Sequence, residues 1–172
     1  MLPHKQIHLF VEVHKMRFVK ASLLLVMLVS IAIPNSAVAA GLGSLVKTEL
    51  GWNLYKKVDS FTDKTKCVIA SSKDARIQVS KGTMYVDYSR KGGVQGYEYR
   101  IDNDPSSGMR LPTETAKSLG FVSFSGQDLS AILGARRLRI QVLTYVSGLK
   151  EEDIDVRGLY KLYDQMVQGC LS

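Results

Sequence analysis

The chain has 172 residues, with 23 Lys and Arg against 16 Asp and Glu, 45% hydrophobic residues, and 14 Gly beside 4 Pro. This length fits one domain with a short appendage. The ordinary hydrophobic and charged fractions exclude a wholly disordered, collagen-like or low-complexity chain.

The N-terminal 40 residues have the features of a secretory signal peptide. Arg17 and Lys20 precede an apolar run at residues 21–33, and small residues follow at Ala37-Val38-Ala39. A positive region, a short apolar region and small residues at the cleavage site are what signal peptidase requires. We therefore predict that residues 1–40 are a signal peptide, with Met16 as an alternative start, cleaved near Ala39 or Ala40.

The alternative is an uncleaved membrane anchor. Extending the count from Ala21 to Ala40 gives 20 largely uncharged residues, but Pro34, Asn35 and Ser36 interrupt them. A spanning helix needs about 20 predominantly apolar residues, so the signal peptide is favoured. The protein is then periplasmic or secreted, and it contacts a membrane only through this segment if the segment stays attached.

Cleavage changes the chemistry of the remaining chain. His4, His8 and His14 all lie in the leader, as do four of the basic residues and one acidic residue, so the mature chain has no histidine and a net charge of +4. Ser-His-Asp and Cys-His catalysis then lack their base, and the charge gives little support for nucleic-acid binding. We expect no enzyme, no cofactor and no nucleic-acid partner.

Residues 41–51 are expected to form a flexible segment before a single β-rich domain at 52–172. Short segments rich in β-branched and aromatic residues recur there between turn signals. Strands are expected at Trp52–Val58, Cys67–Ala70, Ala75–Val79, Thr83–Tyr88, Tyr97–Ile101, Phe121–Phe124, Arg136–Val146 and Ile154–Leu159, and helices at Gln127–Leu133 and Tyr160–Cys170. This order predicts a mainly β fold: one antiparallel β-sandwich or flattened barrel with one short internal helix and a C-terminal helix.

The two cysteines, Cys67 and Cys170, lie near opposite ends of the mature chain. An even number of cysteines in an exported protein indicates a disulfide. A metal-binding role lacks support, because the mature chain has neither a Cys-x-x-Cys motif nor a histidine to complete a zinc site. We therefore predict one disulfide and no metal site.

The C-terminal third resembles small exported bacterial proteins. A helix leads to a basic strand, a turn, a strand ending in Gly-Leu and a helix closed by Cys; the residues are Leu129–Leu133, Ala135–Ile140, Ile154–Leu159 and Cys170, with Trp52, Cys67 and Tyr99–Asp102 at corresponding earlier places. This order resembles the VasI-like accessory proteins of type VI secretion and, more loosely, the invasion-associated locus B proteins. The resemblance implies a periplasmic β-rich domain without a catalytic site that acts through binding.

Four residues are candidates for a binding surface. Arg137 and Arg139 share one face of the strongest predicted strand and could hold a carboxylate or phosphate. The alternative is a solvated outer face balanced by the acidic residues at 151–155. Tyr97 and Tyr99 could stack on a sugar or peptide, or could pack in the core or across strands.

Asp102-Asn103-Asp104 could offer oxygen ligands to Ca²⁺, but an EF-hand loop counted from Asp102 would need Gly at 107 and Glu at 113, where Ser107 and Thr113 stand. An Asx-capped turn before Pro105 is the better interpretation.

Together these features predict a non-enzymatic binding or accessory protein of the bacterial envelope, linked to secretion or invasion, with an unidentified envelope or secreted protein as partner. The alternative is a small inhibitor of a wall-degrading hydrolase, inserting a loop at 91–96 or 103–108.

Overall fold

The computed structural model describes residues 41–80 and 82–170, without the side chain of Cys170. The predicted signal peptide lies outside the described residues. Among the helices that the structure does describe, none combines the length and apolar character needed to cross a bilayer.

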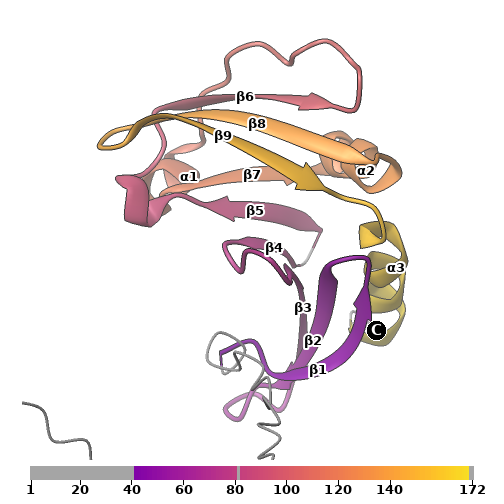
Figure 1. Ribbon diagram of the computed structural model, residues 1–172. Coiled ribbons are helices and arrows are strands. Elements are labelled where there is room, and N and C mark those ends of the chain that lie inside the picture. The colour runs from indigo at the N-terminus through magenta and orange to yellow at the C-terminus, as the bar shows by residue number, and fades with distance from the viewer. Residues whose placement is uncertain (1–40, 81, 171–172) are drawn as a thin grey trace, which may run out of the picture. The chain divides into compact units, whose positions relative to one another are not determined.

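The described chain forms two antiparallel sheets and three α-helices, which confirms the mainly β prediction, and its strands do not close into a barrel (Figure 1). The larger sheet has the order β1 (Ser44–Glu49), β2 (Trp52–Val58), β3 (Thr65–Ser71), β4 (Ile77–Ser80), β5 (Thr83–Asp87) and β7 (Phe121–Ser125). The smaller sheet has the order β6 (Gly96–Ile101), β8 (Arg137–Thr144) and β9 (Gly148–Asp155). The helices are α1 (Glu114–Leu119), α2 (Gly126–Gly134) and α3 (Leu159–Cys170), with a short 3₁₀ turn at Ser89–Lys91.

The chain alternates between the sheets after β5. It enters the smaller sheet at β6, returns through α1 to β7, and leaves again through α2 to β8 and β9. In Figure 1 the smaller sheet lies above β5 and β7, while α3 runs beside β1, β2 and β3. Each helix therefore buries an apolar side without interrupting the strand ladders.

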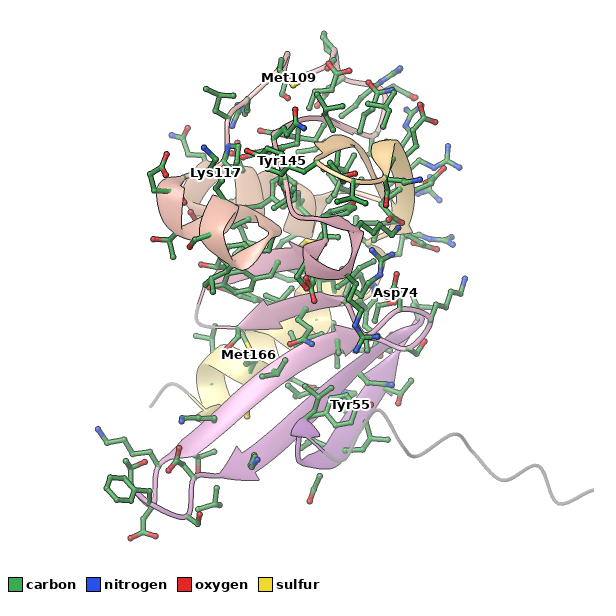
Figure 2. The ribbon with its side chains drawn as sticks, turned by 90° about the vertical axis from the view of Figure 1, so that its left-hand side faces the viewer. Tyr55, Asp74, Met109, Lys117, Tyr145 and Met166 are labelled. Carbon is green, nitrogen blue, oxygen red and sulfur yellow. The ribbon has the colours of Figure 1, made fainter. Side chains whose placement is uncertain are left out.

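Strand alternation explains how the core is filled. On β8, Leu138, Ile140 and Val142 are buried while the residues between them are partly or fully exposed, as a period of two requires. The same pattern on β5 and β7 buries Met84, Val86, Val122 and Phe124 against the smaller sheet. Trp52, Leu54 and Ile69 of the larger sheet join one core with Leu162 and Met166 of α3, and Figure 2 labels Met166 on this helix.

Two elements of the structure, β1 and α1, were not expected from the sequence. Residues 44–49, within the segment expected to be flexible, form β1, an edge strand whose exposed Leu45 and Val46 give no alternating signal. Helix α1 was not predicted; the Thr113 side chain accepts a hydrogen bond from the backbone N–H of Ala116, and Gly120 ends the helix with φ +73°. The structure thus has two internal helices where one was expected.

The last predicted strand, Ile154–Leu159, is wrong in its bounds. The observed strand is β9, Gly148–Asp155, and residues 159 onward already belong to α3. β9 pairs with β8 from Thr144–Gly148 to Arg137–Asp155 and forms an edge of its sheet. The residues of its outer face are mostly acidic, so the sequence of β9 lacks the apolar pattern of a central strand. An edge strand needs only one apolar face.

The predicted Cys67–Cys170 disulfide stays a prediction. Cys67 is buried on β3, whereas the side chain of Cys170 lies outside what the structure describes.

Candidate functional site

The four predicted binding residues lie on opposite faces of the smaller sheet. Tyr97 and Tyr99 of β6 point into the core, and Arg137 and Arg139 of β8 point to the outer face. The structure therefore does not bring the tyrosines and the arginines together on one surface.

The two tyrosines are core residues, with 9% and 8% of their surface exposed. Both rings meet Phe124 of β7 edge to face, at centroid distances of 6.1 Å for Tyr97 and 5.1 Å for Tyr99. The Tyr99 hydroxyl donates a hydrogen bond of 2.6 Å to Asp128 of α2, and Arg110 pairs with the same carboxylate at 2.9 Å. Core packing therefore accounts for both tyrosines.

Burial, followed by the hydrogen bond to Asp128, raises the pKa of Tyr99 to about 12. In the unfolded chain the phenol ionises near its ordinary pKa of about 10. The contribution of Tyr99 to stability is therefore complete below about pH 10 and falls as the pH rises through about 12.

Replacing Tyr99 by Phe should lower the free energy of unfolding by about 1 to 2 kcal/mol, because a charged acceptor in a partly buried setting loses its donor. The variant should also lose stability less steeply between pH 10 and 12 than the wild type. Denaturant titrations at neutral and alkaline pH measure both effects. Unchanged stability would show that the hydroxyl contributes nothing to the packing of α2.

Arg137 occupies an exposed position, with its Nε 3.1 Å from Asp153 Oδ1 on the neighbouring strand. This contact matches the alternative of an outer face balanced by acidic residues. Both groups are about half exposed, so the pair contributes little to stability. Arg137 is accordingly a weaker candidate for ligand binding than its neighbour Arg139.

Arg139 is half-buried, and directly across the ladder lies Arg100 of β6, which the sequence analysis did not select. A turn of the chain holds both guanidinium groups: Nη2 of Arg139 donates to the carbonyl oxygen of Asp102 at 2.6 Å, and Nη2 of Arg100 donates to that of Asn103 at 3.4 Å. The carboxylate of Asp102 accepts the backbone N–H groups of Arg136 at 3.0 Å and Arg137 at 2.8 Å. The 102–104 segment is thus a turn that positions arginines.

The Nε atoms of Arg100 and Arg139 are buried and have no hydrogen-bond acceptor among the described residues. Two adjacent cations with unpaired donors are unfavourable, because a buried polar group needs a partner. An anion placed between them would supply the missing acceptors, since guanidinium groups match carboxylate and phosphate geometry.

These two arginines lie in a groove of about 390 Å³ on the outer face of the smaller sheet; Glu98, Gln141, Glu151 and Asp153 also line it. The acidic residues already have donors. Ser106 Oγ donates to Glu98 at 2.9 Å, Gln141 Nε2 donates to Glu151 at 2.8 Å, and Arg137 pairs with Asp153. The unsatisfied groups at the centre are therefore N–H donors, while the rim carries acceptors that can take more hydrogen bonds.

A second charged cluster connects the two sheets. Glu152 of β9 points inward and lies 3.1 Å from Arg76 and 3.6 Å from Lys91, while Arg76 also pairs with Asp74. Both cations lie 5.7 Å from the ring centre of buried Tyr88. Because its charges pair with one another, we assign this cluster to holding the sheets together. Figure 2 labels Asp74.

The two loops considered for inhibition of a hydrolase differ. In the 91–96 loop Val94 is buried and Lys91 pairs with Glu152, so this loop packs onto the domain. The 103–108 turn is mostly exposed, but Ser107 ties it to β6 through its hydroxyl and the Tyr99 N–H at 3.1 Å. Over the described ranges, no group of three or more His, Cys, Asp or Glu side chains is arranged to hold a metal ion.

Comparison with known proteins finds a distant structural similarity. No protein-family model matches the chain, and no curated protein matches it. The structure is similar to that of invasion associated protein B from Bartonella henselae, with 12% sequence identity and a TM-score of 0.47 over 73% of this chain and 96% of that chain. The resemblance to VasI-like proteins finds no support in these comparisons.

Proposed function

We propose that this protein is a non-enzymatic, exported binding protein of the bacterial envelope, and that its working surface is the groove around Arg100 and Arg139. The observation that supports the proposal is the pair of adjacent guanidinium groups, each with a buried Nε donor that has no acceptor among the described residues. A groove that leaves strong donors unpaired favours an external acceptor.

The fitting partner is an extended protein segment with an acidic side chain at its centre. Its carboxylate would accept from both arginines, and N–H groups on either side would donate to Glu98 and Glu151 at the rim. This mixture of donors and acceptors gives specificity. A wholly basic segment would be repelled by the two arginines, and a wholly acidic segment would be repelled by the carboxylates at the rim.

The double variant Arg100→Gln, Arg139→Gln tests the proposal. Loss of a charged hydrogen-bonded contact in an interface weakens the binding free energy by about 2 to 5 kcal/mol. Capture of the partner from an envelope extract should therefore fall at least about tenfold. The melting temperature should fall only slightly, because the variant loses the contacts with the carbonyl oxygens of Asp102 and Asn103 but also removes two cations whose Nε donors lack acceptors among the described residues. Quantitative pull-down and thermal unfolding measure the two effects.

The matched control is Arg90→Gln, which removes one exposed arginine from the 3₁₀ turn, outside the groove. It should capture the partner as the wild type does. If the double variant and the control capture equally well, the groove is not the working surface.

The more specific role, in secretion or invasion, rests on the sequence resemblance alone. We place it second to the general binding function. A chromosomal position within a secretion-system cluster would support it, whereas co-purification with a wall-degrading hydrolase and inhibition of that enzyme would favour the inhibitor alternative.

A further inference from the structure

The turn between β2 and β3 presents the most exposed large apolar side chain of the described residues. Phe61 is 94% exposed, and Val58 at the end of β2 is also exposed. The Asp59 carboxylate fixes the turn by accepting the backbone N–H groups of Phe61 and Thr62, at 3.1 Å each. The exposed ring is therefore held at the tip of a hairpin that other residues keep in shape.

Four exposed lysines flank this tip: Lys56, Lys57, Lys64 and Lys66. Asp59 forms an ion pair with Lys66, which leaves three lysines against the single carboxylate of Asp63 in residues 56–66. The hairpin thus combines an apolar tip with a positively charged surround. Figure 1 shows this turn at the end of β2 and β3 that is remote from the three-stranded sheet.

The N-terminal end of β1 lies beside the part of β2 that leads into this turn. Ser44 pairs with Lys56 in the β1–β2 ladder. Gly43 lies so close to Lys57 that a Cβ atom added to Gly43 would be 2.8 Å from Lys57 Cβ. Leu45 and Val46 of β1 are both more than half exposed. These two side chains add apolar surface on β1, next to β2 of the hairpin.

We propose that the β2–β3 hairpin docks on an anionic phospholipid surface, with Phe61 inserted at the headgroup boundary and the lysines against lipid phosphates. Aromatic or aliphatic side chains flanked by lysines are typical of segments that lie at a membrane interface, whereas lysine is depleted in the cores of protein–protein interfaces. The sequence analysis limited membrane contact to the N-terminal segment; this surface is a separate one. It leaves the arginine groove free for a partner.

The test is co-sedimentation of the exported protein with vesicles of phosphatidylglycerol and phosphatidylcholine, and with vesicles of phosphatidylcholine alone. We expect binding to the anionic vesicles that weakens as salt is added. Phe61→Ser should reduce this binding at least about tenfold, because it removes the inserted ring. The triple variant Lys56→Gln, Lys57→Gln, Lys64→Gln should reduce it about 100-fold, at about fivefold for each lysine.

Leu111→Ser is the matched control, since Leu111 is 81% exposed but lies between β6 and α1. It should bind anionic vesicles as the wild type does, and all variants should keep the wild-type melting temperature because the substituted side chains are exposed. The proposal is overturned by equal binding to neutral and anionic vesicles, by no binding at low salt, or by a loss in Leu111→Ser that equals the loss in Phe61→Ser. Retained vesicle binding by both hairpin variants also overturns the proposal, because the lipid contact would then lie outside the hairpin.

Discussion

Replacing Trp52 by Ala is expected to lower the free energy of unfolding by about 3 to 5 kcal/mol, the usual effect of removing a buried tryptophan. The indole is 1% exposed within the shared core. Its Nε1 donates a hydrogen bond of 3.0 Å to the carbonyl oxygen of Asp155, so one side chain joins β2 of the larger sheet to β9 of the smaller sheet. Denaturant unfolding followed by circular dichroism measures the loss.

Trp52→Phe separates the two contributions. The phenyl ring keeps most of the apolar burial but leaves the Asp155 carbonyl oxygen without its donor, so we expect a smaller loss of about 1 to 3 kcal/mol from the hydrogen bond and the smaller ring. A Trp52→Ala variant less than about 1 kcal/mol below the wild type would contradict the assignment of Trp52 as the connection between the sheets.

The second large effect concerns the predicted disulfide. Helix α3, which ends at Cys170, packs against β3, which carries Cys67. A bond between the two cysteines closes a loop of about 100 residues and should stabilise the fold by about 4 to 5 kcal/mol in the chain-entropy model. The double variant Cys67→Ala, Cys170→Ala should therefore unfold at a markedly lower denaturant concentration than the oxidised wild type.

Reductant supplies the control for this prediction. It should lower the unfolding midpoint of the wild type and leave the double variant unchanged, because the variant has no bond to lose. Intact-mass analysis of the native protein should show a cleaved leader and a mass lower than that of the reduced form by two hydrogen atoms. Two free thiols in that sample would contradict both the disulfide and the oxidising location.

Local pattern predicted the elements whose two faces differ clearly. Residues 137–142 alternate polar and apolar side chains, and residues 160–170 carry apolar positions at helical spacing. The strand predicted at Arg136–Val146 and the C-terminal helix were therefore found near their observed bounds. Edge strands were harder to recognise. β1 and β9 expose much of one face and one edge to solvent, and their sequences therefore lack the apolar signal of a central strand.

The candidate site depended on information that one strand does not contain. Tyr99 and Arg139 were both selected from their own strands, but their faces follow from the pairing of β6 with β8. Arg100 was missed because its importance arises only when this pairing places it across from Arg139, which lies 39 positions later in the sequence. Arg100 lies between Tyr99 and Ile101, and a charged residue at an outward strand position gives no local signal of such a neighbour.

The most direct test of the proposed function observes the two arginine side chains themselves. Nitrogen-15 NMR detects the Nε–H groups, and the signals of Arg100 and Arg139 are assigned by their disappearance in the single Gln variants. On titration with a peptide that carries a single glutamate among neutral residues, we expect these two signals to shift together and saturate while that of Arg90 stays in place. Unchanged Arg100 and Arg139 signals at peptide concentrations that saturate binding would contradict the claim that the groove between them accepts an acidic partner.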